Sequence, residues 1–145
     1  MTGEWSIREG QGPDVPDILQ LWHDADTTVS VTDTADDIRC VLANPAALLN
    51  VALIDGRIVG TVIGIFDGWR GNIYRMAVHR DYRRQGIASG LLDSVGDFFN
   101  SVGAKRITAL VESEHPWVVG FWDSLGYQYH QGMARYYLNR SNTGV

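Results

Sequence analysis

The stretch from Met76 to Leu92 constrains the fold of this chain more than any other. Residues 76–79 are mostly apolar and predict the end of a strand, whereas residues 80–84 contain three arginines. From residue 85 onward the apolar positions have helical periodicity. A chain that leaves a strand, passes a basic loop and enters a helix places unpaired backbone N–H groups beside arginines, and the helix dipole favours an anion there. The sequence therefore predicts a site for a phosphorylated ligand.

The composition of this stretch supports a close approach of ligand to backbone. Gly86 carries no side chain, and Ala88 adds little bulk. The loop differs from a nucleotide-hydrolysing P-loop, which ends in Gly-Lys-Ser/Thr, and from the spacing of a dinucleotide-binding fingerprint. An alternative interpretation is a helix start whose small residues serve packing alone.

The overall composition predicts one globular domain over residues 1–145, with 45% hydrophobic and 20% charged residues. The net charge of −5, with basic residues concentrated in one loop, argues against a general nucleic-acid partner. No apolar run approaches the roughly 20 residues of a membrane span, and no signal-peptide pattern is present, so we expect no membrane partner and a cytoplasmic location. The single cysteine and four scattered histidines predict neither a disulfide nor a metal site.

The hydrophobic pattern predicts an alternation of strands and helices in one mixed α/β domain. Asp55-Gly56 is a hairpin signal, and Thr34 begins a capping-box-like helix start. Strands are expected at residues 5–9, 48–54, 57–66, 72–79 and 105–112, with a closing hairpin of 127–129 and 133–138. Helices are expected after Asp14, from Thr34 to Ala43, from Gln85 to Val102 and from Trp117 to Leu125.

Four segments resemble one family. Arg83-Arg84-Gln85-Gly86-Ile87-Ala88 is similar to the acyl-CoA pyrophosphate signature Arg/Gln-x-x-Gly-x-Gly/Ala of the GNAT superfamily of N-acetyltransferases. Met76-Ala77-Val78-His79 resembles the splayed fourth strand of that family, and residues 121–127 resemble its Phe-Tyr-x-x-x-Gly-Phe segment. Asp67-Gly68-Trp69-Arg70-Gly71 resembles small bacterial members of the YpeA type.

The resemblance implies the GNAT fold, which has a mostly antiparallel central sheet of six to seven strands, a splayed fourth and fifth strand pair, and about four flanking helices. It also implies an acetyl-CoA-dependent N-acetyltransferase that moves an acetyl group directly to a primary amine of a small molecule or peptide. The Val78 N–H is the implied donor to the thioester oxygen. The implied cofactor-binding residues are Met76, Ala77, Val78, Arg83, Arg84, Gln85, Gly86, Ile87, Ala88, Ser89, His115 and Trp122.

Two positions depart from the family pattern. Trp122 stands where a tyrosine acid is common, and an indole N–H does not act as an acid near neutral pH. Tyr127 is a candidate proton donor by proximity, with a packed core aromatic as the alternative. His115 stands where an asparagine often contacts the cofactor, and an exposed histidine at a helix start is its alternative.

The resemblance also indicates an acceptor side. Glu112 and Glu114 follow the fifth strand, where Glu112 is a candidate base acting through water; a solvated strand end is the alternative. Trp22 and Asp26 at the end of the first helix, and Asp67 and Trp69 before the fourth strand, are candidate acceptor contacts because carboxylates beside aromatic rings suit an ammonium group. Each of them has surface or core packing as its alternative. The candidate substrate-binding residues are Trp22, Asp26, Asp67, Trp69, Glu112 and Glu114.

Two other functions stay open from the sequence alone. A non-catalytic acyl-CoA-binding or sensor domain is favoured by Trp122, and a protein-interaction module would leave the basic loop without a ligand. The sequence leaves the oligomeric state open, with a homodimer as one alternative.

Overall fold

The structure is a computed structural model that describes residues 4–25, 27–111 and 116–140. The chain divides into two compact units, Met1–Leu110 and Val111–Val145, and each is described by itself. Unit 1 contains the sheet and three helices, whereas unit 2 contains one helix followed by a segment without regular secondary structure.

Unit 1 is built on a five-stranded mixed sheet in the order β1-β2-β3-β4-β5. The first four strands pair antiparallel with their neighbours, and β4 pairs with β5 in parallel. The β2–β3 hairpin turns at Asp55 and Gly56, whose φ angles of 50° and 77° fit the left-handed residues of a tight hairpin turn. The strands are β1 (Trp5–Glu9), β2 (Ala47–Ile54), β3 (Arg57–Phe66), β4 (Gly71–Val78) and β5 (Ile107–Ala109).

Local sequence signals mark one end of two of the helices. Thr34 caps the second helix, because its side chain accepts a hydrogen bond from the Asp37 N–H. Gly103, at φ 75°, ends the third helix in the left-handed conformation. The helices are α1 (Val15–Asp24), α2 (Ala35–Ala43), α3 (Ile87–Val102) and α4 (Pro116–Ser124), with short 3₁₀ turns η1 (Gly12–Asp14) and η2 (Arg80–Tyr82).

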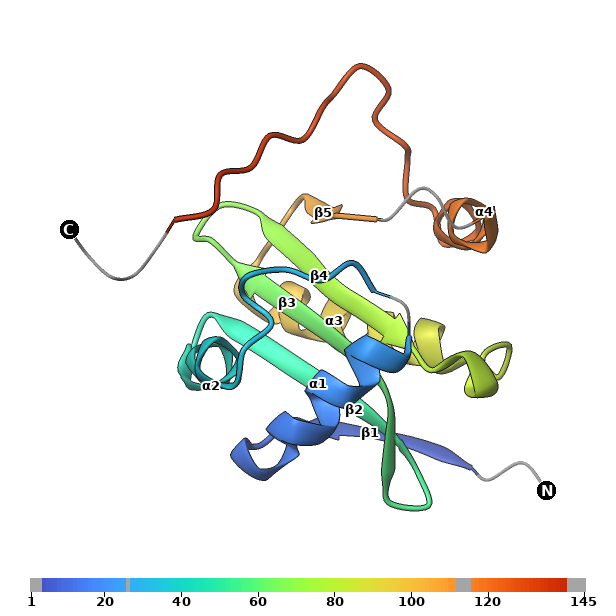
Figure 1. The fold of residues 1–145 in the computed structure, drawn as a ribbon. Helices are drawn as coiled ribbons and strands as arrows, with labels where there is room; N and C mark the ends of the chain where they lie inside the picture. Colours follow the sequence, from blue (N-terminus) through green and yellow to red (C-terminus); the bar gives the residue numbers. More distant parts are fainter. Residues whose placement is uncertain (1–3, 26, 112–115, 141–145) are drawn as a thin grey trace. The chain divides into compact units, whose positions relative to one another are not determined.

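The sheet of unit 1 is covered on both faces (Figure 1), with α1 and α2 on one face and α3 on the other. The core beneath α1 and α2 is formed by side chains such as Ile18, Trp22, Val51 and Ile63, each less than 6% exposed. Burial of such side chains on both faces of the sheet is the main stabilising contribution to a fold of this kind.

Close approach of α3 to the sheet depends on glycines in β3. A Cβ atom at Gly64 would overlap Val95 Cγ2 and lie 3.1 Å from the Phe99 ring. A Cβ atom at Gly60 would lie 3.1 Å from Leu91 and 3.2 Å from Ile87. The helix therefore packs onto a groove left by missing side chains.

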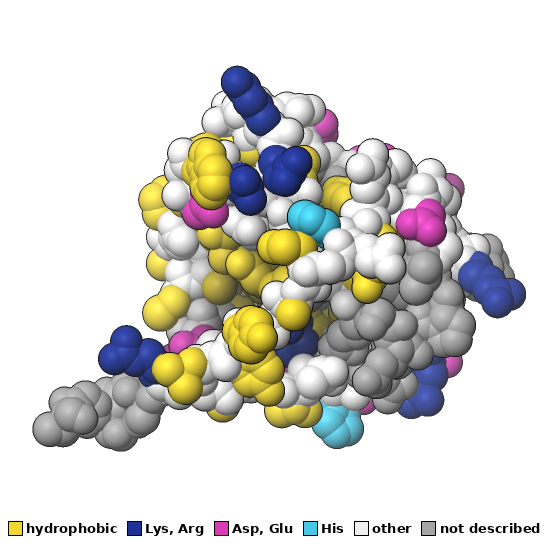
Figure 2. Space-filling model, turned by 90° about the horizontal axis from the view of Figure 1, so that it is seen from above, with side chains coloured by type: hydrophobic (Ala, Val, Ile, Leu, Met, Phe, Trp, Pro, Cys, Tyr) yellow, Lys and Arg dark blue, Asp and Glu magenta, His cyan; other side chains and the backbone are white. Residues whose placement is uncertain are grey.

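The mixed α/β fold and the four helices are confirmed, but six to seven strands are not, because the sheet described here has five. The expected hairpin of 127–129 and 133–138 has no regular secondary structure, since its backbone groups do not pair into a ladder with any described strand. Hydrophobic side chains are visible at the surface (Figure 2). The segment exposes several large ones: Tyr129, Met133, Tyr136, Tyr137 and Leu138.

Two further boundaries differ from expectation. The strand expected at 105–112 is only three residues long, because β5 pairs with β4 at Gly71, Asn72 and Ile73 alone. The third helix begins at Ile87 rather than Gln85, since Arg84 and Gly86 have positive φ angles that no right-handed helix contains. Among the described residues, none of the helices has the length and apolar character to cross a bilayer.

We expect Gly64→Ala to lower the free energy of unfolding by about 1–3 kcal/mol, because the added methyl group meets Val95 and Phe99 with no room to move. Gly96→Ala is the matched control. Gly96 lies inside α3 with nothing within 4 Å of its Cβ position, so alanine there should raise the free energy of unfolding by up to about 1 kcal/mol. Urea denaturation measures the free energy of unfolding of both variants. Equal changes in the two would show that the packing of α3 does not depend on the missing side chain at Gly64.

Candidate functional site

The end of β4 is an open strand edge among the described residues. Pairing with β5 ends at Ile73, so the following residues of β4 have β3 as their one described strand neighbour. The His79 N–H donates to the Val59 carbonyl of β3 at 2.8 Å. Because successive backbone groups alternate in direction, the Val78 N–H points away from β3, and Met76 does so two residues earlier. This edge offers N–H and C=O groups to an amide-containing ligand.

A β-bulge lies directly before this edge. Ile63 of β3 pairs with Tyr74 of β4, but Thr61 pairs with Ala77, so β4 holds one extra residue between the two pairs. Arg75 lies in the bulge at φ 50°, a left-handed conformation that is uncommon for arginine. The bulge therefore changes the direction of β4 where the open edge begins.

The basic loop after β4 has the geometry of an anion site. Arg84 and Gly86 have φ angles of 66° and 83°, and the first helical hydrogen bond of α3 runs from Gly90 N–H to the Gly86 carbonyl at 3.0 Å. No described residue accepts a hydrogen bond from the backbone N–H groups of residues 84–89. Six consecutive donors at the positive end of a helix dipole favour a phosphate or pyrophosphate.

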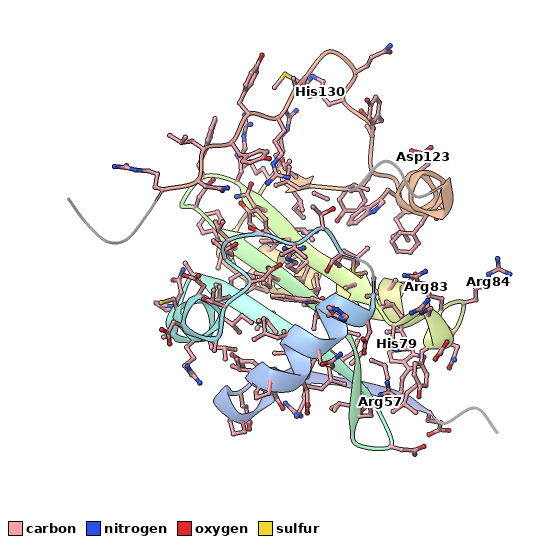
Figure 3. The ribbon with its side chains drawn as sticks, in the orientation of Figure 1. Arg57, His79, Arg83, Arg84, Asp123 and His130 are labelled. Carbon is pink, nitrogen blue, oxygen red and sulfur yellow. The ribbon has the colours of Figure 1, made fainter. Side chains whose placement is uncertain are left out.

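Two of the three arginines of this loop, Arg83 and Arg84, have different roles in the structure. Arg83 Nε donates to the Val78 carbonyl at 3.2 Å, which links the loop to the end of β4. The Arg84 side chain is exposed and extends away from β4 (Figure 3). Arg84 is therefore free to move onto an anion, whereas Arg83 holds the loop close to the strand edge.

Trp5 of β1 is hydrogen-bonded to the loop, a contact that the sequence pattern did not indicate. Its indole Nε1–H donates to the Gln85 carbonyl at 2.9 Å. The same ring lies against α3, because a Cβ atom at Gly90 would lie 2.5 Å from Trp5 Cη2. This contact gives the Gln85 carbonyl a partner and ties the loop to β1. The alternating pattern of residues 5–9 predicted the strand but carried no signal for this contact.

The sequence that forms this site matches a known family. A profile of the acetyltransferase (GNAT) family matches residues 15–127. The chain belongs to the GNAT acetyltransferase family. Residues 83–88, which resemble the acyl-CoA pyrophosphate signature of this family, lie inside the matched range.

Solved structures share this GNAT fold over nearly the whole chain. A transcriptional regulator from Bacillus halodurans C-125 is 21% identical, with a TM-score of 0.78 over 92% of this chain and 100% of that one. A predicted acetyltransferase with acetyl-CoA from Clostridium acetobutylicum is 16% identical, with a TM-score of 0.75 over 92% and 96%. Glucosamine-6-phosphate N-acetyltransferase from Arabidopsis thaliana is 17% identical, with a TM-score of 0.75 over 94% and 99%.

The candidate acceptor residues of unit 1 lie at separate places. Trp22 is 4% exposed, and its Nε1–H donates to Thr61 Oγ1 at 2.9 Å beside the bulge. Asp67 and Trp69 precede Gly71, the first residue of β4, whereas Val78 is the last residue of that strand. The structure brings Trp22 close to the open edge and leaves Asp67 and Trp69 distant from it.

The Asp67 carboxylate organises its own loop. Its Oδ1 accepts from the N–H groups of Trp69 at 2.8 Å and Arg70 at 2.7 Å, and these backbone hydrogen bonds are the main cause of its lowered pKa. The Arg70 guanidinium lies 3.9 Å above the Trp69 ring, which is 71% exposed. The Asp67 carboxylate therefore remains ionised at neutral pH, and its hydrogen bonds to Trp69 and Arg70 close a turn.

Unit 2 holds Trp122 and Tyr127 in one aromatic contact. Their ring centroids are 4.8 Å apart at 84°, an edge-to-face arrangement, and Phe121 makes a similar contact with Trp122 at 5.7 Å. Burial raises the pKa of the Tyr127 hydroxyl above its ordinary value. The hydroxyl therefore stays protonated across the neutral range. Four candidates, Asp26, Glu112, Glu114 and His115, lie outside the described residues.

We expect Trp5→Phe to loosen the anion loop, because phenylalanine keeps an aromatic ring but loses the donor to Gln85. Amide hydrogen exchange of Gly90, whose N–H donates to the Gly86 carbonyl beside the Trp5 ring, should accelerate severalfold, and the free energy of unfolding should fall by about 1 kcal/mol. Trp69→Phe changes an exposed tryptophan and should alter neither. Unchanged exchange in Trp5→Phe would show that the loop holds its shape without this hydrogen bond.

Proposed function

We propose that this chain is an acetyl-CoA-dependent N-acetyltransferase that moves an acetyl group directly to a primary amine of a small molecule or peptide. The observation that carries the proposal is the row of N–H groups at residues 84–89, with no described acceptor, directly after the open edge of β4. Membership of the GNAT family supports it, and so does the fold shared with an acetyltransferase whose structure contains acetyl-CoA.

The donor set fits the cofactor. The N–H groups of residues 84–89 and the Arg84 guanidinium would hold the pyrophosphate, and the edge from Met76 to Val78 would pair with the amides of the pantetheine arm. Ile87, Ala88 and Ser89 belong to the first turn of α3 and contribute their N–H groups. Acetyl-CoA supplies an acetyl group activated as a thioester. Ser89, His115 and Trp122 are carried over as cofactor contacts from the family resemblance.

Val78 is the proposed source of electrostatic stabilisation. Its N–H points away from β3 and would donate to the oxygen on which negative charge develops during acyl transfer. A donor fixed in a strand needs no reorganisation, and such donors contribute about 3–4 kcal/mol in other acyl-transfer enzymes. Holding amine and thioester together contributes more, on the order of 7–11 kcal/mol in ideal cases.

Proton transfers are assigned to two other residues. We propose that Tyr127, protonated at neutral pH, donates to the leaving thiolate, because the Trp122 indole is no acid. Glu112 is the proposed base that takes the amine proton through water. Trp22, Asp26 and Glu114 remain proposed acceptor contacts, whereas Asp67 and Trp69 precede β4, at the opposite end of that strand from Val78, and stay predictions from the sequence. The family match crosses from unit 1 into unit 2, which supports residues 1–145 as one acetyltransferase domain.

A second function is favoured by Trp122 alone. A chain that binds acyl-CoA without turnover would keep the loop at residues 84–89 and need no acid at position 122. Thiol release across a panel of amines separates this sensor function from the enzyme.

We expect the protein to bind acetyl-CoA in calorimetry, and Gly86→Ala to raise its Kd about tenfold, because a side chain at φ 83° strains the loop by on the order of 1 kcal/mol or more. Gly56→Ala is the matched control, since Gly56 also has a positive φ, of 77°, and open space around it. That variant should bind like the wild type. Absence of binding by the wild type would exclude both the enzyme and the sensor.

We expect Tyr127→Phe to lower kcat about 100-fold with little change in the KM for acetyl-CoA, because a positioned general acid typically contributes that much. Because burial raises its pKa, the hydroxyl keeps its proton across the neutral range, and we expect no loss of activity from its ionisation there. Tyr129→Phe, at a tyrosine that is 80% exposed, is the control. A kcat equal to that of the control would assign Tyr127 to packing.

A further inference from the structure

Arg75 is a cation in the middle of a strand whose neighbours are mostly apolar, and its side chain is only 17% exposed. Its Nη2 lies 2.7 Å from each carboxylate oxygen of Asp33, whose side chain is 14% exposed. A pair shielded from solvent to this extent is screened by salt less than a surface pair. It joins β4 to the segment between α1 and α2, across 42 residues of sequence.

The same residue is fixed at its backbone. The Arg75 carbonyl accepts from the Thr61 hydroxyl at 2.9 Å, and Thr61 Oγ1 accepts in turn from the Trp22 indole at 2.9 Å. The Arg75 guanidinium carbon also lies 5.2 Å from the centroid of the Trp22 ring, within the range of a cation–π contact. Arg75 thus connects α1, β3 and the bulge of β4 around one buried tryptophan.

Asp33 organises the other side of the contact. Its Oδ2 accepts from the Ser30 N–H at 3.0 Å, and its own N–H donates to the Ser30 carbonyl at 3.0 Å. At the start of the same segment, the Thr27 hydroxyl donates to the Trp22 carbonyl at 2.6 Å. Residues 27–33 are therefore held at both ends, while Val29 and Val31 between them are 83% and 58% exposed.

We propose that the Arg75–Asp33 pair is a positioning device that holds residues 27–33 against the β4 bulge as one wall of the acceptor site. The inference rests on the proposed function and adds to it a residue pair that sets where the amine enters. Arg75 is in the bulge that directs the edge carrying Val78, so one residue fixes both the wall for the amine and the strand that polarises the thioester.

The test uses two variants and a matched control. Asp33→Asn removes the charge from the loop side. Arg75→Gly removes the guanidinium but accepts φ 50° without strain, so the bulge itself stays. Asp36→Asn is the control, because the Asp36–Arg39 pair on α2 is an exposed ion pair with side chains 96% and 59% accessible. The amines tried are lysine, spermidine, glucosamine and a lysine-containing peptide, and the one that the wild type acetylates fastest is used.

In both variants we expect amide exchange of residues 27–33 to accelerate at least tenfold and the KM for the amine to rise about tenfold, with the Kd for acetyl-CoA within twofold of wild type. Combining Arg75→Asp with Asp33→Arg restores an opposite-charge pair, since aspartate tolerates the left-handed conformation, and should recover most of the lost affinity for the amine. The Asp36→Asn control should match the wild type in all three measurements.

Unchanged amide exchange of residues 27–33 in Asp33→Asn would show that the ion pair does not hold this segment in place. Faster exchange with an unchanged KM for the amine would overturn its role at the acceptor site. Failure of the wild type to bind acetyl-CoA or to acetylate any of these amines would instead overturn the proposed function and with it the acceptor role. The exchange measurement needs no activity, so it separates these two failures.

Discussion

The early end of pairing between β4 and β5 is the constraint on which the site depends. Backbone N–H and C=O groups inside a protein need partners, and a sheet normally supplies them through the next strand. Here the parallel ladder holds three residue pairs and stops at Ile73, so among the described residues no second strand pairs with the last residues of β4 along one edge. The bulge at Arg75 turns this edge, and Arg83 ties the following loop to its last carbonyl.

Much of the fold was predictable because its signals are local. The strands at residues 5–9 and 57–66 were predicted to the residue, since alternation and a continuous apolar run define them. The Asp55-Gly56 turn and the Thr34 cap follow from side-chain chemistry within four residues. The order of strand, basic loop and helix after residue 71 was predictable for the same reason, because its signals are contiguous in sequence.

Features that depend on distant residues were not predictable. The Trp5 contact with Gln85 spans 80 positions, and nothing in the alternation of β1 distinguishes that ring from an ordinary strand residue. The bulge at Arg75 leaves one trace, a charge inside an apolar strand, but its partner Asp33 lies in a segment without periodicity. The hairpin expected at residues 127–129 and 133–138 is absent from the described structure, because a strand also needs a neighbour that pairs with it, and the sequence of the segment alone does not show whether one is present.

The glycines that seat α3 on β3 have a consequence for the history of such a chain. The helix whose first turn presents the anion donors is held at a distance set by the absence of two side chains, at Gly60 and Gly64. Any drift to a larger residue there would push the helix outward and carry with it the N–H groups that we propose to hold the phosphate, though neither glycine is among the proposed binding residues. Selection on ligand affinity would therefore also act on core positions such as Gly60 and Gly64. Substitutions there would change affinity while every residue proposed to contact the ligand stays the same.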